Sequence, residues 1–269
     1  MFIYQNPKDL FYVAHKHEES PNIKHFFGHS HEHHEIFLFI QGNASFNIEG
    51  NIFKLSPFDI VMIPPQQYHC LILDSISKYE RYVLEIPPKY LNSDYRTVFS
   101  APTIFNIADN SSLVSLFSRL DAYHNMLSGE DFASMCQLLV RECMLLLKTS
   151  LIHRSVEHSY DPLTKRMLTY INENITLPLS AELLSEHFFL SKSHVQNVFH
   201  QNMKIGMKQY ITQKKMLLAK ELLQKGKKPY EVAEHLSYKD YTTFFKNFKR
   251  HYRLPPQAFS PKNRMKPSS

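Results

Sequence analysis

Short apolar segments recur along the first hundred residues, and residues that favour turns separate each segment from the next. The first is IFLFI (36–40), which QGN (41–43) follows directly. Four further segments have the same character: ASFNIEG (44–50), FKL (53–55), DIVMIPP (59–65) and YVLEI (82–86). Many short strands at close spacing are typical of a sandwich or a small barrel. The pattern therefore predicts a β domain over residues 1–105.

After this region the spacing of apolar residues changes to that of helices. Apolar residues recur every three or four positions in 112–127, and the same spacing continues through 131–151. Such spacing predicts amphipathic helices. We expect a helical hairpin over 106–153 that covers the β domain, forms a helix-on-helix dimer interface, or does both. The polar segment 154–161 has no periodicity and is expected to be a linker.

A repeated pattern occupies the rest of the chain. SEHFFLS (185–191) and AEHLSYKD (233–240) each contain a small residue, Glu-His, an apolar residue, a turn and a helix-capping residue. Amphipathic helices are predicted directly after them, over 192–203 and 241–252. A small residue near the end of one helix lets the next helix cross closely, as in a helix-turn-helix. We therefore expect an all-α domain over 162–269 with two such motifs.

A long amphipathic segment, 207–226, connects the two motifs. It ends at Gly226, and Pro229 stands where the first turn of a new helix accepts proline. A rigid helix here would hold both motifs at a fixed separation. That separation would be near the ~34 Å of one DNA turn if the two second helices lie in successive major grooves.

The polar faces of the two second helices have residue types that suit base recognition. Gln and Asn suit adenine, and Lys suits guanine edges or phosphates. Phe245 is an exception. Its ring either packs in the core or contacts a thymine methyl group, and the sequence leaves both interpretations open. The candidate DNA-contacting residues are Lys192, Ser193, Gln196 and Asn197 in the first helix, and Tyr241, Thr242, Phe245, Lys246 and Lys249 in the second.

Charge divides unevenly along the chain, whose net charge is +6 at pH 7. Residues 162–269 contain 19 Lys and Arg against 7 Asp and Glu, a net charge of +12, whereas residues 1–161 carry −6. A basic C-terminal part joined to an acidic N-terminal part favours nucleic-acid binding, although well-solvated Lys-rich helices would have the same charge.

Other features concern the compartment. No segment approaches the roughly 20 apolar residues that span a bilayer, and MFIYQNPKDL does not have the pattern of a signal peptide. The three cysteines form no CxxC motif and are interpreted as reduced core thiols. We therefore expect a cytoplasmic protein without membrane contact.

The region from Leu168 to Phe259 resembles the AraC/XylS family of bacterial transcription regulators. The resemblance is carried by LLAKELL (217–223), by the stretch from Tyr230 to Arg250 and by PPQAF (255–259). Residues at that family's signature positions are Phe244, Phe248, Lys249, Pro256, Tyr238 and Asp240. The resemblance implies sequence-specific DNA binding and transcriptional regulation.

The chain also departs from that family's pattern. Lys204, Ser237 and Arg253 stand where the family usually has glycine, and Lys215 and Ser260 stand where it usually has arginine. If the turns keep a positive φ without glycine, we expect a cost of about 1 kcal/mol for each.

A histidine cluster precedes the first strand, in HSHEHHEIFLFIQG (29–42). Its spacing resembles the first motif of the cupin domains that often precede this DNA-binding unit, and the spacing from Pro64 to His69 resembles the second motif, with Phe58 in place of the leading glycine. On a strand, residues 29, 31, 33 and 35 would share one face. We therefore expect His29, His31, Glu35 and His69 to converge inside a β-barrel.

Three roles are open for these four residues. Three imidazoles and a carboxylate suit Zn, Fe, Mn or Ni, so a transition metal is one candidate cofactor. A polar ligand held by hydrogen bonds of roughly 1 kcal/mol each is the second, and a polar barrel wall is the third. Since the resemblance implies a small organic effector, often a sugar, a ligand site is expected. His33 and His34 are expected to pack or face solvent, and His15, His17 and His25 to lie in a polar arm near the barrel mouth.

The expected function is that of a DNA-binding transcriptional regulator, without catalytic residues, that responds to a small molecule such as a sugar. Two alternatives remain: a metal-dependent cupin enzyme tethered to DNA, and a constitutive DNA binder whose barrel serves only for dimerisation. The expected partners are double-stranded DNA, a small-molecule effector, RNA polymerase and a second copy of the chain.

Overall fold

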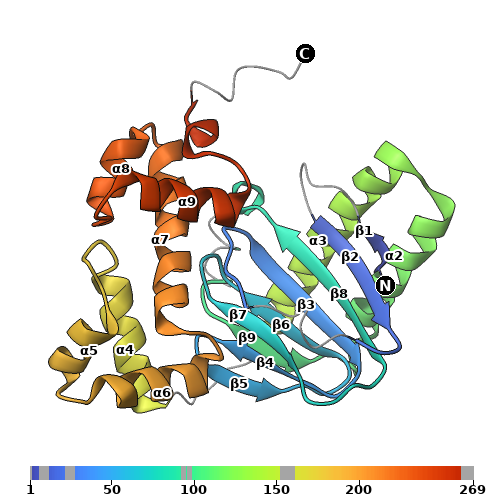
Figure 1. The fold of residues 1–269 in the computed structure, drawn as a ribbon. Coiled ribbons are helices and arrows are strands. Elements are labelled where there is room, and N and C mark those ends of the chain that lie inside the picture. The colour runs from blue at the N-terminus through green and yellow to red at the C-terminus, as the bar shows by residue number, and fades with distance from the viewer. Residues whose placement is uncertain are drawn as a thin grey trace. The chain divides into compact units, whose positions relative to one another are not determined.

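The computed structural model describes residues 2–5, 12–21, 28–91, 95, 99–151 and 161–261. The chain divides into two compact units (Figure 1). The first unit consists of residues 1–27, 31–48 and 52–159, and the second consists mainly of residues 160–269. Within the described ranges, no helix combines the length and apolar character needed to cross a membrane.

Strands of the first unit form a six-stranded and a three-stranded sheet (Figure 1). The larger sheet has the order β1-β2-β8-β3-β6-β9 with antiparallel neighbours, and the smaller one has the order β5-β4-β7. The strands are β1 (Phe2–Gln5), β2 (Tyr12–Glu18), β3 (His34–Gln41), β4 (Ala44–Ile48), β5 (Asn51–Lys54), β6 (Asp59–Ile63), β7 (His69–Leu73), β8 (Tyr79–Ile86) and β9 (Thr103–Asn106), and a 3-10 helix, η2 (Pro88–Tyr90), follows β8.

Side chains of β3 alternate between two cores. Phe37 and Phe39 face the smaller sheet and pack in the core between the sheets. Ile36 and Leu38 face the opposite way, against helices α2 (Ser111–Met126) and α3 (Gly129–Leu151). Because both faces of β3 are buried, its sequence is an unbroken apolar run rather than an alternating one.

Helices α2 and α3 form the predicted hairpin, and they cover the outer face of the larger sheet (Figure 1). The first role expected for the hairpin is therefore confirmed. The structure corrects the expected polar arm, since His15 and His17 lie within β2, which pairs with β8 along its whole length. His25 and most of the expected linker lie outside the described residues.

The second unit is helical, as predicted. Its helices are α4 (Pro162–Glu173), α5 (Ala181–Phe188), α6 (Lys192–Met203), α7 (Met207–Gln224), α8 (Pro229–His235) and α9 (Tyr241–Tyr252), followed by the 3-10 helix η3 (Pro256–Phe259). The pairs α5–α6 and α8–α9 are the two helix-turn-helix motifs, and α7 connects them. Pro229 is the first residue of α8, where its missing N–H costs no helical hydrogen bond.

Each second helix begins directly after its predicted capping residue. The Ser191 hydroxyl accepts a hydrogen bond from the backbone N–H of His194 at 3.2 Å, and the Asp240 carboxylate accepts one from that of Thr243 at 2.7 Å. These bonds satisfy N–H groups that a helix start leaves without a helical partner. The caps fix where α6 and α9 begin.

Three turns keep a left-handed backbone without glycine. Lys204, Ser237 and Arg253 have φ values of 56°, 53° and 60°, in the positions where glycine was expected. A side chain with a Cβ costs roughly 1–2 kcal/mol in this conformation. The second unit therefore retains the turn geometry that the repeat requires and carries its steric cost.

Candidate ligand site and nucleic-acid interface

Four side chains with metal-ligating atoms lie close together: His29, His31, Glu35 and His69. One ligand atom from each lies within 4.8 Å of the others. Glu35 comes from β3 and His69 is the first residue of β7, so the two sheets each contribute to the cluster. Glu35 and His69 are buried, His31 is half-buried and His29 is exposed.

Two imidazoles point the same nitrogen at one carboxylate oxygen. Nε2 of His31 lies 2.9 Å and Nε2 of His69 lies 3.3 Å from Oε2 of Glu35. Their Nδ1 atoms donate to the backbone carbonyls of His33 and Gln67 at 3.1 and 3.0 Å. Metal-ligating histidines usually anchor their second nitrogen on such a carbonyl. This donor set fits a transition metal bound through Nε2 and a carboxylate.

The electrostatics of the cluster favour an ionised Glu35. Burial acts to raise the pKa of Glu35, but the imidazoles of His69 and His31 outweigh it and hold that pKa well below its usual value. Burial likewise acts to lower the pKa of His31, and the Glu35 carboxylate more than compensates, so the His31 pKa is raised. The cluster therefore presents a buried anion between two imidazoles, which suits a cation or a hydrogen-bond donor.

The expected single strand face is wrong for this segment. Strand β3 begins only at His34, and the chain bends at Glu32 and His33. His33 is not one of the clustered ligand residues, and its Nδ1 lies 3.2 Å from a carboxylate oxygen of Glu85. The sequence analysis did not include Glu85, which lies opposite Glu35 in β8. Its one indication in the sequence is that Glu85 is the single charged residue of the apolar segment YVLEI.

Most of the predicted DNA-contacting side chains are exposed on α6 and α9. The exposed ones are Lys192, Ser193, Gln196, Asn197, Thr242, Lys246 and Lys249. Two others are half-buried: the Tyr241 hydroxyl accepts a hydrogen bond from Gln257 at 3.1 Å, and the Phe245 ring lies 6.2 Å from that of Tyr241. Lys192 also forms an ion pair with Glu182.

Comparisons with known proteins agree with this architecture. An AraC-like ligand binding domain matches residues 11–123, and a helix-turn-helix domain matches residues 184–261. The probable transcriptional regulator LumQ of Photobacterium leiognathi is 24% identical over 235 residues, which are 86% of this chain and 90% of that protein. The multiple antibiotic resistance protein MarA of Escherichia coli (strain K12) is 30% identical over 94 residues, which are 35% of this chain and 74% of MarA.

Among solved structures, ToxT from Vibrio cholerae is 10% identical, with a TM-score of 0.39, and the match covers 93% of this chain and 98% of that chain.

The matches to the ligand binding domain and to the helix-turn-helix domain define the chain as a DNA-binding transcriptional regulator with a separate ligand-binding domain. The chain belongs to the AraC family of transcriptional regulators.

Proposed function

We propose that this regulator reads a specific DNA site with the exposed polar faces of α6 and α9, and that it responds to a small molecule held at the cluster of His29, His31, Glu35 and His69. The observation that carries the proposal is the pair of matched, capped second helices on one connecting helix, each with an exposed polar face. Electrophoretic shift with duplexes selected from a random library tests it, and failure to select any duplex sinks it.

Gln196→Ala is expected to weaken binding to the selected duplex by about 1–3 kcal/mol and to relax specificity at one base pair. The reason is the loss of a bidentate amide contact with a base edge. Gln201→Ala is the matched control, since Gln201 is exposed near the other end of α6. Wild-type affinity in the Gln196 variant would mean that the reading face of α6 is assigned wrongly.

Lys249→Ala, by contrast, should weaken binding to all duplexes alike, because it removes a phosphate contact. The slope of the logarithm of affinity against the logarithm of salt concentration should decrease by about one.

A polar organic effector such as a sugar is the first candidate ligand of the cluster, because the cluster offers hydrogen-bonding groups on a partly buried wall. Thermal denaturation with a panel of sugars measures this. A bound effector at 100 times its Kd stabilises the chain by about 2.7 kcal/mol. Absence of stabilisation by every sugar would exclude that class.

A transition-metal ion is the second candidate, and the anchored Nδ1 atoms of His31 and His69 favour it. His69→Ala is expected to weaken binding of Zn²⁺ or Ni²⁺ by more than about 10-fold. Removal of a residue that only supports a metal ligand already costs about 10-fold or more, and His69 would be a ligand itself. Calorimetric titration with the metal salt alone provides the measurement. His33→Ala is the control, since His33 pairs outside the cluster. Equal affinities in both variants would remove the metal from consideration.

We infer that the cluster senses its ligand without catalysing a reaction, since the relatives are transcriptional regulators. Turnover of a substrate that is lost in His31→Ala would contradict this inference.

We also propose RNA polymerase as a partner, because a promoter-bound regulator acts on the enzyme that transcribes from that promoter. We propose a cytoplasmic location, because DNA and the polymerase are found there. A ternary complex of chain, promoter and polymerase in an electrophoretic shift checks the partner.

The exposed face of α3 is the proposed dimer interface. Leu138 and Leu145 are 60% and 52% exposed and lie seven residues apart, so they share one side of the helix. The double variant Leu138→Glu, Leu145→Glu is expected to sediment as a monomer at concentrations where the wild-type chain is a dimer. Ile76→Glu adds charge at another exposed apolar site of the same unit and should leave the dimer intact. A wild-type chain that is monomeric throughout would refute the interface.

A further inference from the structure

Lys215 lies near the middle of α7 with its side chain directed into the second unit. The residue is only 7% exposed, which is unusual for lysine. Its Nζ donates to the backbone carbonyl of Leu177 at 2.8 Å and to that of Leu236 at 2.7 Å. Burial lowers the pKa of Lys215 to about 8, so the ammonium group remains largely charged at pH 7. Charged donors make stronger hydrogen bonds than neutral ones.

The two carbonyls belong to different motifs. Leu177 lies in the loop between α4 and α5, directly before the first helix-turn-helix. Leu236 is the C-cap of α8, directly before the turn of the second. Its carbonyl is one of the groups that a helix end leaves without a helical partner. One ammonium group on the connecting helix therefore binds main-chain atoms beside both motifs.

A cavity of about 640 Å³ lies between the motifs, and Lys215 is part of its lining. Gln196 of α6 and Asn247 of α9 line it from the two sides. Because side chains do not fill this space, direct packing there does not hold the motifs at their separation. The separation depends instead on α7 and on the bonds that α7 makes to each motif.

We propose that Lys215 is a positioning residue for DNA recognition: its two backbone bonds set the spacing and rotation of α6 relative to α9, and thereby the spacing of the two DNA elements that the chain accepts. This inference rests on the proposed reading faces of α6 and α9. Lys215 itself is too buried for a phosphate contact, which distinguishes it from exposed lysines such as Lys249. A change of one base pair shifts the elements by about 3.4 Å and roughly 35°, so small movements between α6 and α9 affect the choice of site.

The test uses the full chain and the duplex that the wild-type chain selects from a random library. Affinities are measured for that duplex, for versions with one base pair added or removed between the elements, and for each element alone. The wild-type chain should lose at least about 10-fold in affinity when the spacing changes, since a displaced base contact costs about 1–3 kcal/mol. Lys215→Met should bind the original duplex at least about 10-fold more weakly and discriminate less than about 3-fold among spacings, with single-element affinity nearly unchanged.

Two further variants separate positioning from stability. Lys215→Arg keeps the charge and the donors and should restore the spacing preference. Lys220→Met makes the same change on the same helix, where Nζ lies over the rings of Tyr252 and Phe259. It should lower stability and preserve the spacing preference, because these two rings belong to α9 and η3 and not to the first motif.

A Lys215→Met chain with the wild-type spacing preference would overturn the inference, as would an equal loss of affinity for single and paired elements. If the Met variant does not fold, Lys215→Gln carries the same comparison with a shorter neutral donor. Failure of the wild-type chain to select any duplex would instead refute the proposed reading faces, so the two failures are distinguishable.

Discussion

Phe248→Ala is expected to lower the free energy of unfolding of the second unit by about 3–5 kcal/mol and to abolish specific DNA binding at micromolar protein. Phe248 is fully buried at the centre of the second motif. Its ring centroid lies 5.7 Å from that of Phe244, 4.8 Å from that of Tyr252 and 5.4 Å from that of Phe259. Truncation leaves a cavity at the point where α9 and η3 meet, so α9 loses the support of its inner face.

Urea denaturation followed by circular dichroism measures the first effect, and electrophoretic shift measures the second. Phe189→Ala is the matched control, because Phe189 is 94% exposed in the turn of the first motif. Its effect on stability should stay within about 0.5 kcal/mol. Equal stabilities of the two variants would show that the aromatic core does not support α9.

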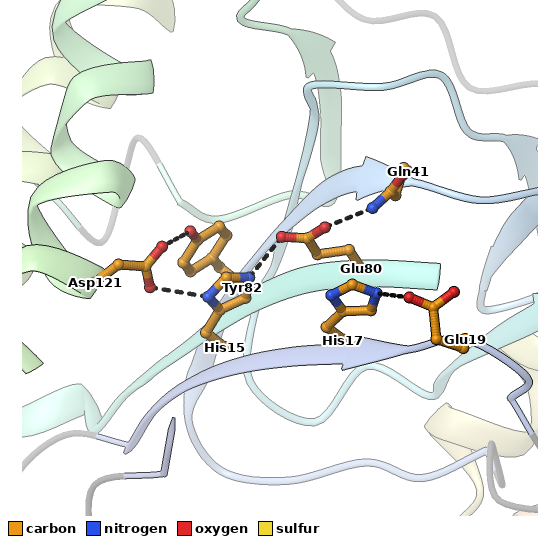
Figure 2. A network of polar contacts seen from close by, with 7 residues as sticks. All are labelled: His15, His17, Glu19, Gln41, Glu80, Tyr82 and Asp121. Carbon is orange, nitrogen blue, oxygen red and sulfur yellow. Dashed lines mark hydrogen bonds and ion pairs between the residues drawn. The ribbon is translucent and has the colours of Figure 1, made fainter. Parts of the chain in front are cut away.

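The second large effect concerns His15, which joins β2 to β8 and to α2 (Figure 2). His15 is 4% exposed, and its Nδ1 and Nε2 lie 2.8 Å from Oδ1 of Asp121 and 2.9 Å from Oε1 of Glu80. A carboxylate only accepts hydrogen bonds, and a neutral imidazole has one N–H, so both bonds require the imidazolium. The ring also stacks on Tyr82, whose hydroxyl donates to Asp121, and Gln41 donates to Glu80 at 2.6 Å.

This arrangement makes the stability of the first unit depend on pH. Burial acts to lower the pKa of His15, but Asp121 and Glu80 together outweigh it, so the pKa is raised above 6.5. A raised histidine pKa gives stability that is fully present below the unfolded-state pKa, about 6.5, and is lost as pH rises through the folded-state pKa. Tyr82 stays protonated over this range, because burial and Asp121 raise its pKa as well.

His15→Phe keeps an aromatic ring beside Tyr82 and removes the titrating group. We expect it to destabilise the chain by about 3 kcal/mol at pH 6, the low end for one broken buried ion pair, and by less at pH 9. Denaturation midpoints measured from pH 6 to 9 provide the comparison with the wild-type chain. His17→Phe alters the neighbouring histidine of β2, which pairs with the exposed Glu19 (Figure 2), and should keep the wild-type pH dependence. A pH-independent difference between His15→Phe and the wild-type chain would contradict the charged network.

The helical unit was predictable almost to the residue. Helices over 192–203 and 241–252 follow from local signals, namely a capping residue and apolar positions three or four apart. The connecting helix ends at Gln224, two residues before the glycine that terminates the pattern. These signals suffice because each hydrogen bond of a helix joins residues only four positions apart.

The sheets were predicted less completely, because their pairing is not local. Strand β2, YVAHKHE, has no clear alternation, and β7, HCLIL, is short. One partner of β2 is β8, whose paired residues lie 61 to 73 positions further along the chain. The buried ion pair of His15 becomes evident only when both strands are placed. Pairing partners at such distances leave little trace in a single sequence.

For the histidine cluster, motif spacing brought His31, Glu35 and His69 into one expected site, and the structure places them together. Spacing did not indicate the bend at Glu32 and His33, because a bend depends on backbone angles that polar side chains tolerate without a clear sequence signal. That bend decides which histidines enter the cluster.

Because both faces of β3 are buried, this strand lies between the core of the two sheets and the helical hairpin. Glu35 lies on the inner face of this strand, and its neighbour Ile36 packs against the helical hairpin on the outer face. The candidate ligand site and the residue that packs against the hairpin are therefore adjacent in the sequence, separated by a single peptide bond. A displacement of β3 at Glu35 would therefore also move Ile36 against the hairpin.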